Sequence, residues 1–176
     1  MATTFTVSSG DYIRPWKNVE IKEFPVHVSQ TVLAGSILQK GGAGYENRVI
    51  LSTDTVTTGI VGVALEAITT TATHNAVTDR VLVALATTDA EFIGRTVADD
   101  AVDFTDTGVA VECEIDATYS ITRVETDQTT YETVKVLGYL DPITMNKQAT
   151  EGDTSVWAIF KFIPGATIFG PGIILQ

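Results

Sequence analysis

The chain has 176 residues, which suits one domain and is too short for two ordinary ones. Its 44% hydrophobic and 19% charged residues can bury a substantial core, which excludes wholesale disorder. Eleven basic against 22 acidic side chains give a formal net charge of -11. A protein that binds by neutralising phosphates needs a cationic surface, so this charge argues against nucleic acid and anionic membranes as partners.

β-Branched residues dominate the composition, because 28 Thr, 20 Val and 15 Ile make up about 36% of the chain. Such residues favour strands over helices. We therefore predict a mainly β fold, either a compact β-sandwich or a partly closed β-barrel, with at most one short helix.

Residues 1–24 differ from the rest and predict an extended N-terminal arm, followed by a β-rich domain over residues 25–176. Pro15 lacks an N–H and biases the residue before it toward extended geometry. The arm is rich in aromatic and cationic side chains, the types that dominate protein interfaces. We predict a partner contact at the following residues: Tyr12, Ile13, Arg14, Trp16 and Lys17. The alternative is that Trp16 packs on its own domain.

The first seven residues have neither a basic region nor an apolar stretch, so no secretory signal is visible. The longest apolar run outside the C-terminal tail is far shorter than the ~20 residues that span a bilayer. We therefore expect a soluble protein that is made without export and does not enter a membrane.

Segments of strand length recur from Phe24 onward, with turn signals between them. The strongest, residues 59–68, is followed by a Thr-rich tip at 69–75 and an apolar return strand at 80–86, which predicts a hairpin. Further strands are predicted at residues 26–32, 36–39 and 48–53.

A second long hairpin is predicted from residues 119–125 and 130–140. Residues 156–162 predict a final core strand. Alternation in this strand places four apolar side chains on one face: Val156, Ala158, Phe160 and Phe162.

One helix is predicted after residue 88. Thr88 and Glu91 have the spacing of a capping box, in which the hydroxyl and the carboxylate accept hydrogen bonds from the first N–H groups of a helix. The apolar residues that follow share one face at roughly helical period: Ala90, Ile93, Val97 and Ala101.

No residue set points to catalysis, and we predict a non-enzymatic protein without a cofactor or a metal. His27 and His74 are not accompanied by a Gly-x-Ser-x-Gly elbow, so we interpret them as a core or edge histidine and an exposed turn histidine. Cys113 lies between Glu112 and Glu114, which disfavour the thiolate, and we interpret it as an inert strand residue.

Two carboxylate-rich segments leave alternatives open. Residues 99–106 carry four Asp, the oxygen ligands that calcium prefers, but they lack the order of an EF-hand and are explained equally by a solvated acidic loop. Glu112, Glu114 and Asp116 alternate along a strand and could divide acid and base roles in a glycosidase, or could line an exposed strand face. The glycines at 41–44 do not match a phosphate-binding loop.

Three apolar segments stand in a distinctive order: residues 31–38 read TVLAGSIL, residues 59–67 read GIVGVALEA and residues 81–85 read VLVAL. In this order they resemble the capsid decoration proteins of tailed bacteriophages, also called cement or head-stabilising proteins. The similar part covers roughly residues 31–95.

The resemblance implies a small β-rich domain of the β-tulip type, often trimeric, that binds the outer capsid surface and bridges neighbouring major capsid subunits without catalysis. We therefore expect a structural protein of the virion that is made in the host cytoplasm. Its expected partners are the major capsid protein, through the arm residues given above, and two further copies of itself. An acidic surface suits the outside of such a particle better than a surface that faces packaged DNA.

The final residues, 163–176, are too apolar to be left in water, and their prolines and glycines exclude a regular helix or a long central strand. They must cover the chain's own core, a neighbouring subunit or the capsid. We predict a subunit interface at these residues: Ile168, Phe169, Ile173, Ile174 and Leu175.

Two other functions compete with capsid decoration. The first is a calcium-dependent carbohydrate-binding or adhesive β-sandwich, in which residues 99–106 hold the calcium. The second is a small glycan-acting enzyme that uses Glu112, Glu114 or Asp116.

Overall fold

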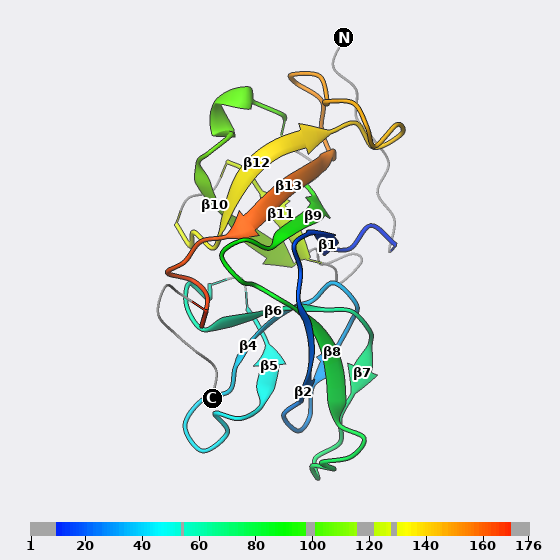
Figure 1. Cartoon of the computed structure of the whole chain (residues 1–176), viewed down its shortest axis with the longest axis vertical. Helices are drawn as coiled ribbons and strands as arrows, with labels where there is room; N and C mark the ends of the chain where they lie inside the picture. Colours follow the sequence, from blue (N-terminus) through cyan, green and yellow to red (C-terminus); the bar gives the residue numbers. More distant parts are fainter. Residues whose placement is uncertain (1–9, 54, 98–100, 116–121, 128–129, 170–176) are drawn as a thin grey trace.

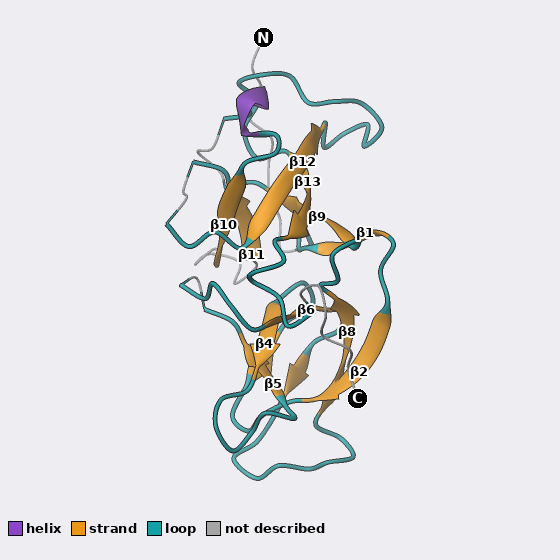
Figure 2. Ribbon diagram, turned by 60° about the vertical axis from the view of Figure 1, so that its left-hand side comes forward, coloured by secondary structure: helices purple, strands orange, loops and turns teal. Residues whose placement is uncertain are grey.

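The computed structural model describes residues 10–53, 55–97, 101–115, 122–127 and 130–169. These residues form a mainly β structure with two main antiparallel sheets, one above the other along the long axis of the molecule (Figures 1 and 2). Helical structure among the described residues is limited to one 3-10 turn, η1 (Phe104–Asp106). The predicted mainly β fold is therefore confirmed, and neither sheet closes into a complete barrel.

Six strands form the upper sheet, in the upper half of Figure 1. In spatial order they are β1 (Arg14–Lys17), β9 (Glu91–Arg95), β13 (Trp157–Phe162), β12 (Val134–Leu140), β10 (Ala110–Ile115) and β11 (Thr122–Glu125). The sheet curls, because Thr96, just after β9, makes a parallel bridge with Val124 of the edge strand β11.

Five strands form the lower sheet. In spatial order they are β2 (Ile21–Pro25), β8 (Arg80–Leu85), β6 (Ile60–Ala64), β4 (Ile37–Lys40) and β5 (Val49–Leu51). This sheet also curls, since Val26, just after β2, bridges Val49 of the opposite edge strand. A separate two-stranded ladder joins β3 (Thr31–Val32) and β7 (Ile68–Thr69).

Strand β6 lies between two apolar cores, and all five of its residues are buried. Ile60 and Val63 belong to the large core, which lies against the upper sheet and extends into the lower one. Val61 and Ala64 belong to the smaller core of the lower sheet. A strand that is buried on both faces needs a nearly continuous apolar run, which explains why this segment has the strongest strand signal in the sequence.

The predicted antiparallel pairing of residues 59–68 with 80–86 is confirmed for β6 and β8, but β6 ends at Ala64, and Ile68 belongs to β7, which pairs with β3. Strands β6 and β8 approach closely at Gly62, where a Cβ atom would collide with the carbonyl oxygen of Ala84. The predicted final strand is confirmed as β13, and Val156, Ala158, Phe160 and Phe162 are all buried in the large core.

The segment after β13 returns from the upper sheet to the lower one (Figure 1). There Ile60 donates its N–H to the carbonyl of Ala166 at 2.8 Å, and Ile168 donates to the carbonyl of Ile60 at 3.0 Å. Residues 163–169 therefore tie the end of the upper sheet to the central strand of the lower sheet.

The predicted helix after residue 88 is wrong, because residues 91–95 form strand β9. Consecutive residues of this strand are buried, including Phe92 and Ile93. A strand between β1 and β13 can bury both faces in this way, whereas the predicted helix would have exposed one side. The capping-box spacing of Thr88 and Glu91 was outweighed by this tertiary packing.

The predicted hairpin between residues 119–125 and 130–140 is also wrong. Strand β10 pairs with β11 on one side and with β12 on the other, so it lies between the two strands that the prediction joined. The pattern of apolar residues predicted strands in this region, but it carries no information on which strand pairs with which.

Residues 10–24, the described part of the predicted N-terminal arm, are not separate from the sheets. Strand β1 pairs with β9 in the upper sheet, and β2 pairs with β8 in the lower sheet. Residues 14–24 are thus part of both sheets and connect them. Residues 1–9 lie outside the described residues.

Candidate functional site

The structure separates the five predicted contact residues of the arm into two groups. Ile13 is 1% exposed and belongs to the large core, and Tyr12 is half-buried. Arg14, Trp16 and Lys17 are exposed on β1. Only the second group is available to a partner, so the buried Ile13 is corrected from a contact residue to an anchor for its neighbours.

Polar contacts fix this strand to the upper sheet. The Arg14 guanidinium lies 4.7 Å from the centre of the Trp157 ring, and Lys17 Nζ lies 3.8 Å from a carboxylate oxygen of Glu91. Just before the strand, an Asp11 carboxylate oxygen lies 3.9 Å from Nε of the buried Arg95. Contacts at both ends of β1 therefore attach Arg14 and Lys17 to neighbouring strands.

Burial of the positively charged Arg95 beside β1 costs electrostatic free energy. Burial lowers the pKa of its guanidinium, Asp11 opposes the shift, and the nearby Arg123 adds to it. The Arg95 guanidinium also lies 5.3 Å from the centre of the Trp157 ring. The acidic and aromatic neighbours thus offset part of the cost of a cation that is only 2% exposed.

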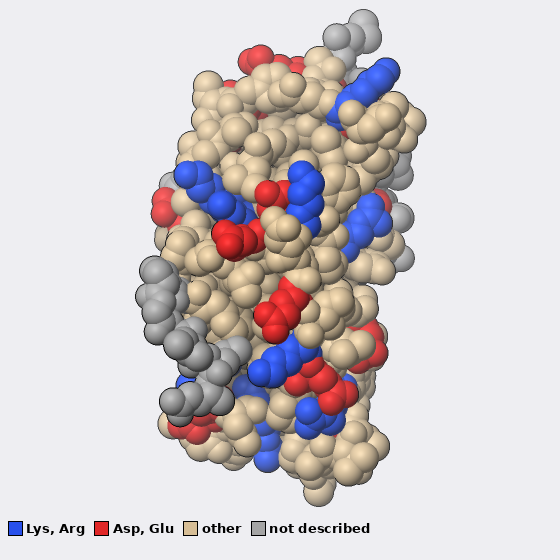
Figure 3. Space-filling model, viewed as in Figure 1, with Lys and Arg blue, Asp and Glu red and all other residues tan. Residues whose placement is uncertain are grey.

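We define the edge surface as the exposed residues Arg14, Trp16, Lys17, Ile21 and Leu82. Its three apolar members, Trp16, Ile21 and Leu82, are 37%, 55% and 40% exposed. They come from β1, β2 and β8, so the surface crosses from the upper sheet to the lower one. Figure 3 shows cationic and anionic side chains interspersed with uncharged residues over the face on which these strands run.

Ile168 and Phe169, from the predicted subunit interface, pack against the smaller core of their own chain and are half-buried. The other three residues of that prediction, Ile173, Ile174 and Leu175, lie outside the described residues. The described part of the tail thus covers the lower sheet.

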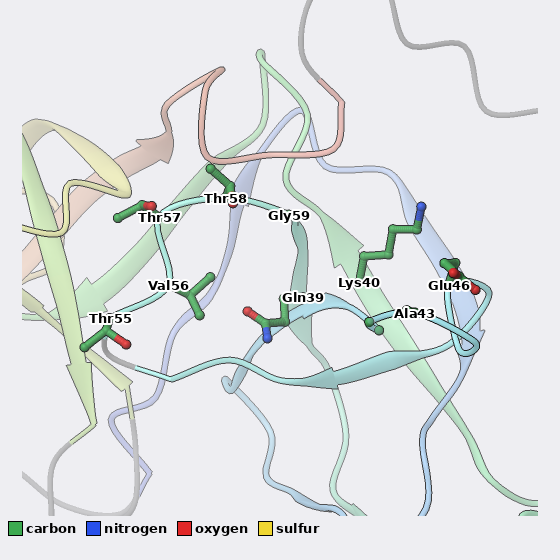
Figure 4. Close-up of a pocket in the computed structure, with 11 residues that line it drawn as sticks. Gln39, Lys40, Ala43, Glu46, Thr55, Val56, Thr57, Thr58 and Gly59 are labelled. Carbon is green, nitrogen blue, oxygen red and sulfur yellow. The ribbon is translucent and has the colours of Figure 1, made fainter.

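A polar cleft lies at one end of the lower sheet (Figure 4). Residues 39–43 and Glu46 form one wall, residues 55–59 form the other, and the space between them is about 650 Å³. Figure 4 shows the Gln39 side chain directed toward the wall that carries Val56, while Lys40 and Glu46 extend from the opposite wall. Sequence reasoning missed this cleft, although Gly-rich and Thr-rich loops beside β4 and β6 were visible.

Short hydrogen bonds hold the Gly-rich wall of the polar cleft. Gly41 donates its N–H to the carbonyl of Arg48 at 2.8 Å, and Tyr45 donates to the carbonyl of Gly42 at 2.9 Å. The Glu46 carboxylate accepts from the N–H of Gly44 at 3.0 Å. Hydrogen bonds from the N–H of Glu46 itself and then from that of Gly44 lower the pKa of Glu46, and Lys40 adds a smaller contribution.

The candidate catalytic residues have local structural contacts. The His27 ring lies 4.2 Å from the Tyr45 ring, and His74 Nδ1 lies 3.5 Å from a carboxylate oxygen of Asp79. Glu112 accepts a hydrogen bond from the N–H of Tyr131 at 3.0 Å. Strand pairing sets Glu114 opposite Arg123, and Cys113 is buried in the same strand; Asp116 lies outside the described residues.

The acidic segment is described only from residue 101 onward, so Asp99 and Asp100 lie outside the described residues. Asp103 caps η1 by accepting a hydrogen bond from the N–H of Thr105 at 2.8 Å, which lowers the pKa of this aspartate. Burial raises the pKa of Asp106, and Asp103 and Asp127 add to that shift. Within the described ranges, no group of three or more His, Cys, Asp or Glu residues could hold a metal ion.

Comparison with protein-family models gives no match for this chain, and comparison with curated proteins gives none either. In the part of the chain that the structure describes, no helix is long and apolar enough to cross a membrane.

Proposed function

We propose that the chain is a non-enzymatic structural protein that binds the outer surface of a phage capsid and cements neighbouring major capsid subunits. The edge surface is the contact, and Trp16 with its flanking Arg14 and Lys17 is its centre. In this proposal the protein acts in the virion, and the major capsid protein is its principal partner.

The observation that carries the proposal is an exposed aromatic residue on a strand whose inner side is anchored. Trp16 is 37% exposed, whereas Ile13, three residues earlier, is 1% exposed in the large core. Pairing of β1 with β9 fixes the backbone that carries Trp16, which lowers the entropy lost on docking, and tryptophan and arginine are frequent binding hot spots.

The position of the resembling segments also supports the proposal. Residues 31–38 include β3 and the start of β4, residues 59–67 include β6, and residues 81–85 belong to β8. Strands β4, β6 and β8 are direct neighbours in the lower sheet, so most of the resemblance falls on adjacent strands. Strand β2, which carries Ile21 of the edge surface, is the next strand of that sheet.

We further propose that three copies associate, as the resemblance implies. In this proposal the subunit contact is made by Ile173, Ile174 and Leu175, which lie outside the described residues. Light scattering of the full-length protein tests the association directly, and a monomer at high protein concentration would contradict it.

The capsid contact is tested by adding purified variants to mature capsids that lack the protein and measuring the bound fraction. Trp16→Ala should weaken binding by about 2 kcal/mol, roughly thirtyfold, because it removes the central aromatic side chain. Tyr131→Ala is the matched control, since Tyr131 is 38% exposed and lies outside the edge surface.

Trp16 and Tyr131 are exposed to the same degree, so the two variants should show similar, small decreases in melting temperature, and capsid binding is compared at a temperature at which both are folded. Capsid binding that is equally strong in Trp16→Ala and the parent would exclude the edge surface as the contact. If the parent protein itself does not bind capsids, the proposed function is wrong.

A further inference from the structure

We propose that the polar cleft is a binding site for a neutral saccharide. The site uses residues 39–43, Glu46 and 55–59, none of which belongs to the edge surface. The inference is therefore independent of capsid binding.

The walls of the polar cleft present mostly hydrogen-bonding groups. Gln39 supplies an amide, and Thr55, Thr57 and Thr58 supply hydroxyl groups. The glycines at 42 and 59 leave their backbone uncovered by side chains of their own. A ligand with many hydroxyl groups can exchange its hydrogen bonds with water for bonds to such walls, whereas an apolar ligand cannot.

The charges in the polar cleft favour a ligand without net charge. Lys40 and Glu46 are the two ionisable residues among the described residues that line it, and they carry opposite charges on the same wall. A phosphate beside Lys40 would also lie near the Glu46 carboxylate, which repels it. A cationic ligand beside Glu46 would likewise lie near the positive charge of Lys40. A neutral polyol can use both groups as hydrogen-bonding partners without an unpaired charge.

The two walls are held relative to each other before any ligand arrives. At the base of the cleft, Lys40 donates its N–H to the carbonyl of Gly59 at 2.8 Å, which joins one wall to the other. Gly41 is buried, and a Cβ atom there would collide with the carbonyl of Tyr45, so the Gly-rich loop is packed tightly. Such preorganisation lowers the entropy lost when a flexible sugar binds.

No aromatic side chain is among the described residues that line the cleft. Saccharide binding that lacks a stacking platform depends on hydrogen bonds, so the expected affinity is weak, with a dissociation constant on the order of 1 mM. This affinity range decides the choice of method.

The test is an NMR titration of the full-length, nitrogen-15-labelled protein with three neutral trisaccharides, namely maltotriose, cellotriose and chitotriose. At least one should shift the amide signals of residues 39–46 and 55–59 in a saturable manner at concentrations up to about 20 mM. Inorganic phosphate serves as the charged probe and should not shift them.

Two variants connect the shifts to the polar cleft. Gly42→Trp should abolish binding and leave the fold intact, because a Cβ atom at Gly42 meets nothing within 4 Å and the ring can occupy the open space. Thr58→Val should weaken binding at least threefold, because it removes a hydroxyl group. Thr73→Val, an exposed threonine outside the cleft, should bind like the parent.

Three results would overturn the inference. These are the absence of shifts with all three trisaccharides, shifts with phosphate in place of the sugars, and sugar binding that survives Gly42→Trp. Capsid binding is measured separately and should be the same for Gly42→Trp and the parent protein, so failure of either proposal can be recognised on its own.

Discussion

Ile13 occupies the space that a side chain at Gly94 would take. A Cβ atom built on Gly94 would lie 2.9 Å from Cγ1 of Ile13, closer than carbon atoms pack. A second glycine, Gly35, has a positive φ of 83°, and a Cβ atom built on it would lie 2.9 Å from the backbone nitrogen of Ile13. The isoleucine is thus held between the upper sheet and a turn of the lower one, and it joins the two.

We predict that Ile13→Ala lowers the free energy of unfolding by about 2–5 kcal/mol, because it leaves a cavity in the large core. Ile21→Ala is the control, since Ile21 is 55% exposed, and it should change stability by less than about 0.5 kcal/mol. Chemical denaturation of both variants measures the difference. Equal stability of the two variants would contradict the role of Ile13 as an anchor.

A related prediction concerns deletion of residues 1–20. If these residues were a separable arm, the deletion would leave the melting temperature unchanged. Because it removes Ile13 and strand β1, we expect a clear loss of stability instead. For this reason the point variant Trp16→Ala, rather than the deletion, is the sound test of capsid binding.

The tail is expected to stabilise the lower sheet. Phe169→Ala should lower the free energy of unfolding by about 1 kcal/mol, because Phe169 is half-buried against the smaller core. Ile143→Ala, at a residue that is 80% exposed, should have no measurable effect. If both substitutions are neutral, the described tail does not contribute to this core.

Removal of residues 170–176 separates the two roles of the tail. We expect the truncated protein to keep its melting behaviour, because Ala166 and Ile168 retain their hydrogen bonds to Ile60. If the removed residues join subunits, light scattering should show monomers. Trimers of the truncated protein would show that the subunit interface lies in another part of the chain.

Asp106 gives a prediction for pH dependence. Its raised pKa, due first to burial, means that the ionised form is less favourable in the folded than in the unfolded state. This destabilisation is present at neutral pH and disappears as the pH falls through the raised pKa toward the ordinary value of about 4. Asp106→Asn should therefore be more stable than the parent at pH 7, with the gain vanishing in acid.

Asp141→Asn should behave in the opposite way. The hydrogen bond from the N–H of Thr144 lowers the pKa of Asp141, so its ionised form stabilises the fold above about pH 4, and this contribution is lost as the pH falls through the lowered pKa. The substitution should be destabilising at pH 7. Denaturation curves between pH 2 and 7 compare the two variants, and changes of the same sign at pH 7 would contradict the assignment.

Calcium is expected to have no effect on stability. The described part of the acidic segment uses Asp103 as a cap and presents no group of ligands for a metal. Neither a chelator nor millimolar calcium should shift the melting temperature. A ligand at about 100 times its dissociation constant would add ~2.7 kcal/mol of stability, so an upward shift would reveal a calcium site clearly.

The sequence alone was sufficient for the fold class and for the strands β6 and β13. The β-branched composition predicted a mainly β protein, and the apolar run of β6 and the alternation of β13 predicted strands in the right places. These signals are local, because burial on one face or on both leaves a period in the sequence itself.

The tertiary structure decided the features that depend on contacts between distant residues. Strand β9 replaced the predicted helix because β1 and β13 pack on its two sides, and β10 lies between β11 and β12 because pairing is not encoded in any one segment. Ile13 is an anchor and not a contact because Gly94, far along the chain, leaves room for it. The polar cleft arises in the same way, since its two walls are brought together by the pairing of β4 with β6 and by the hydrogen bond from the N–H of Lys40 to the carbonyl of Gly59.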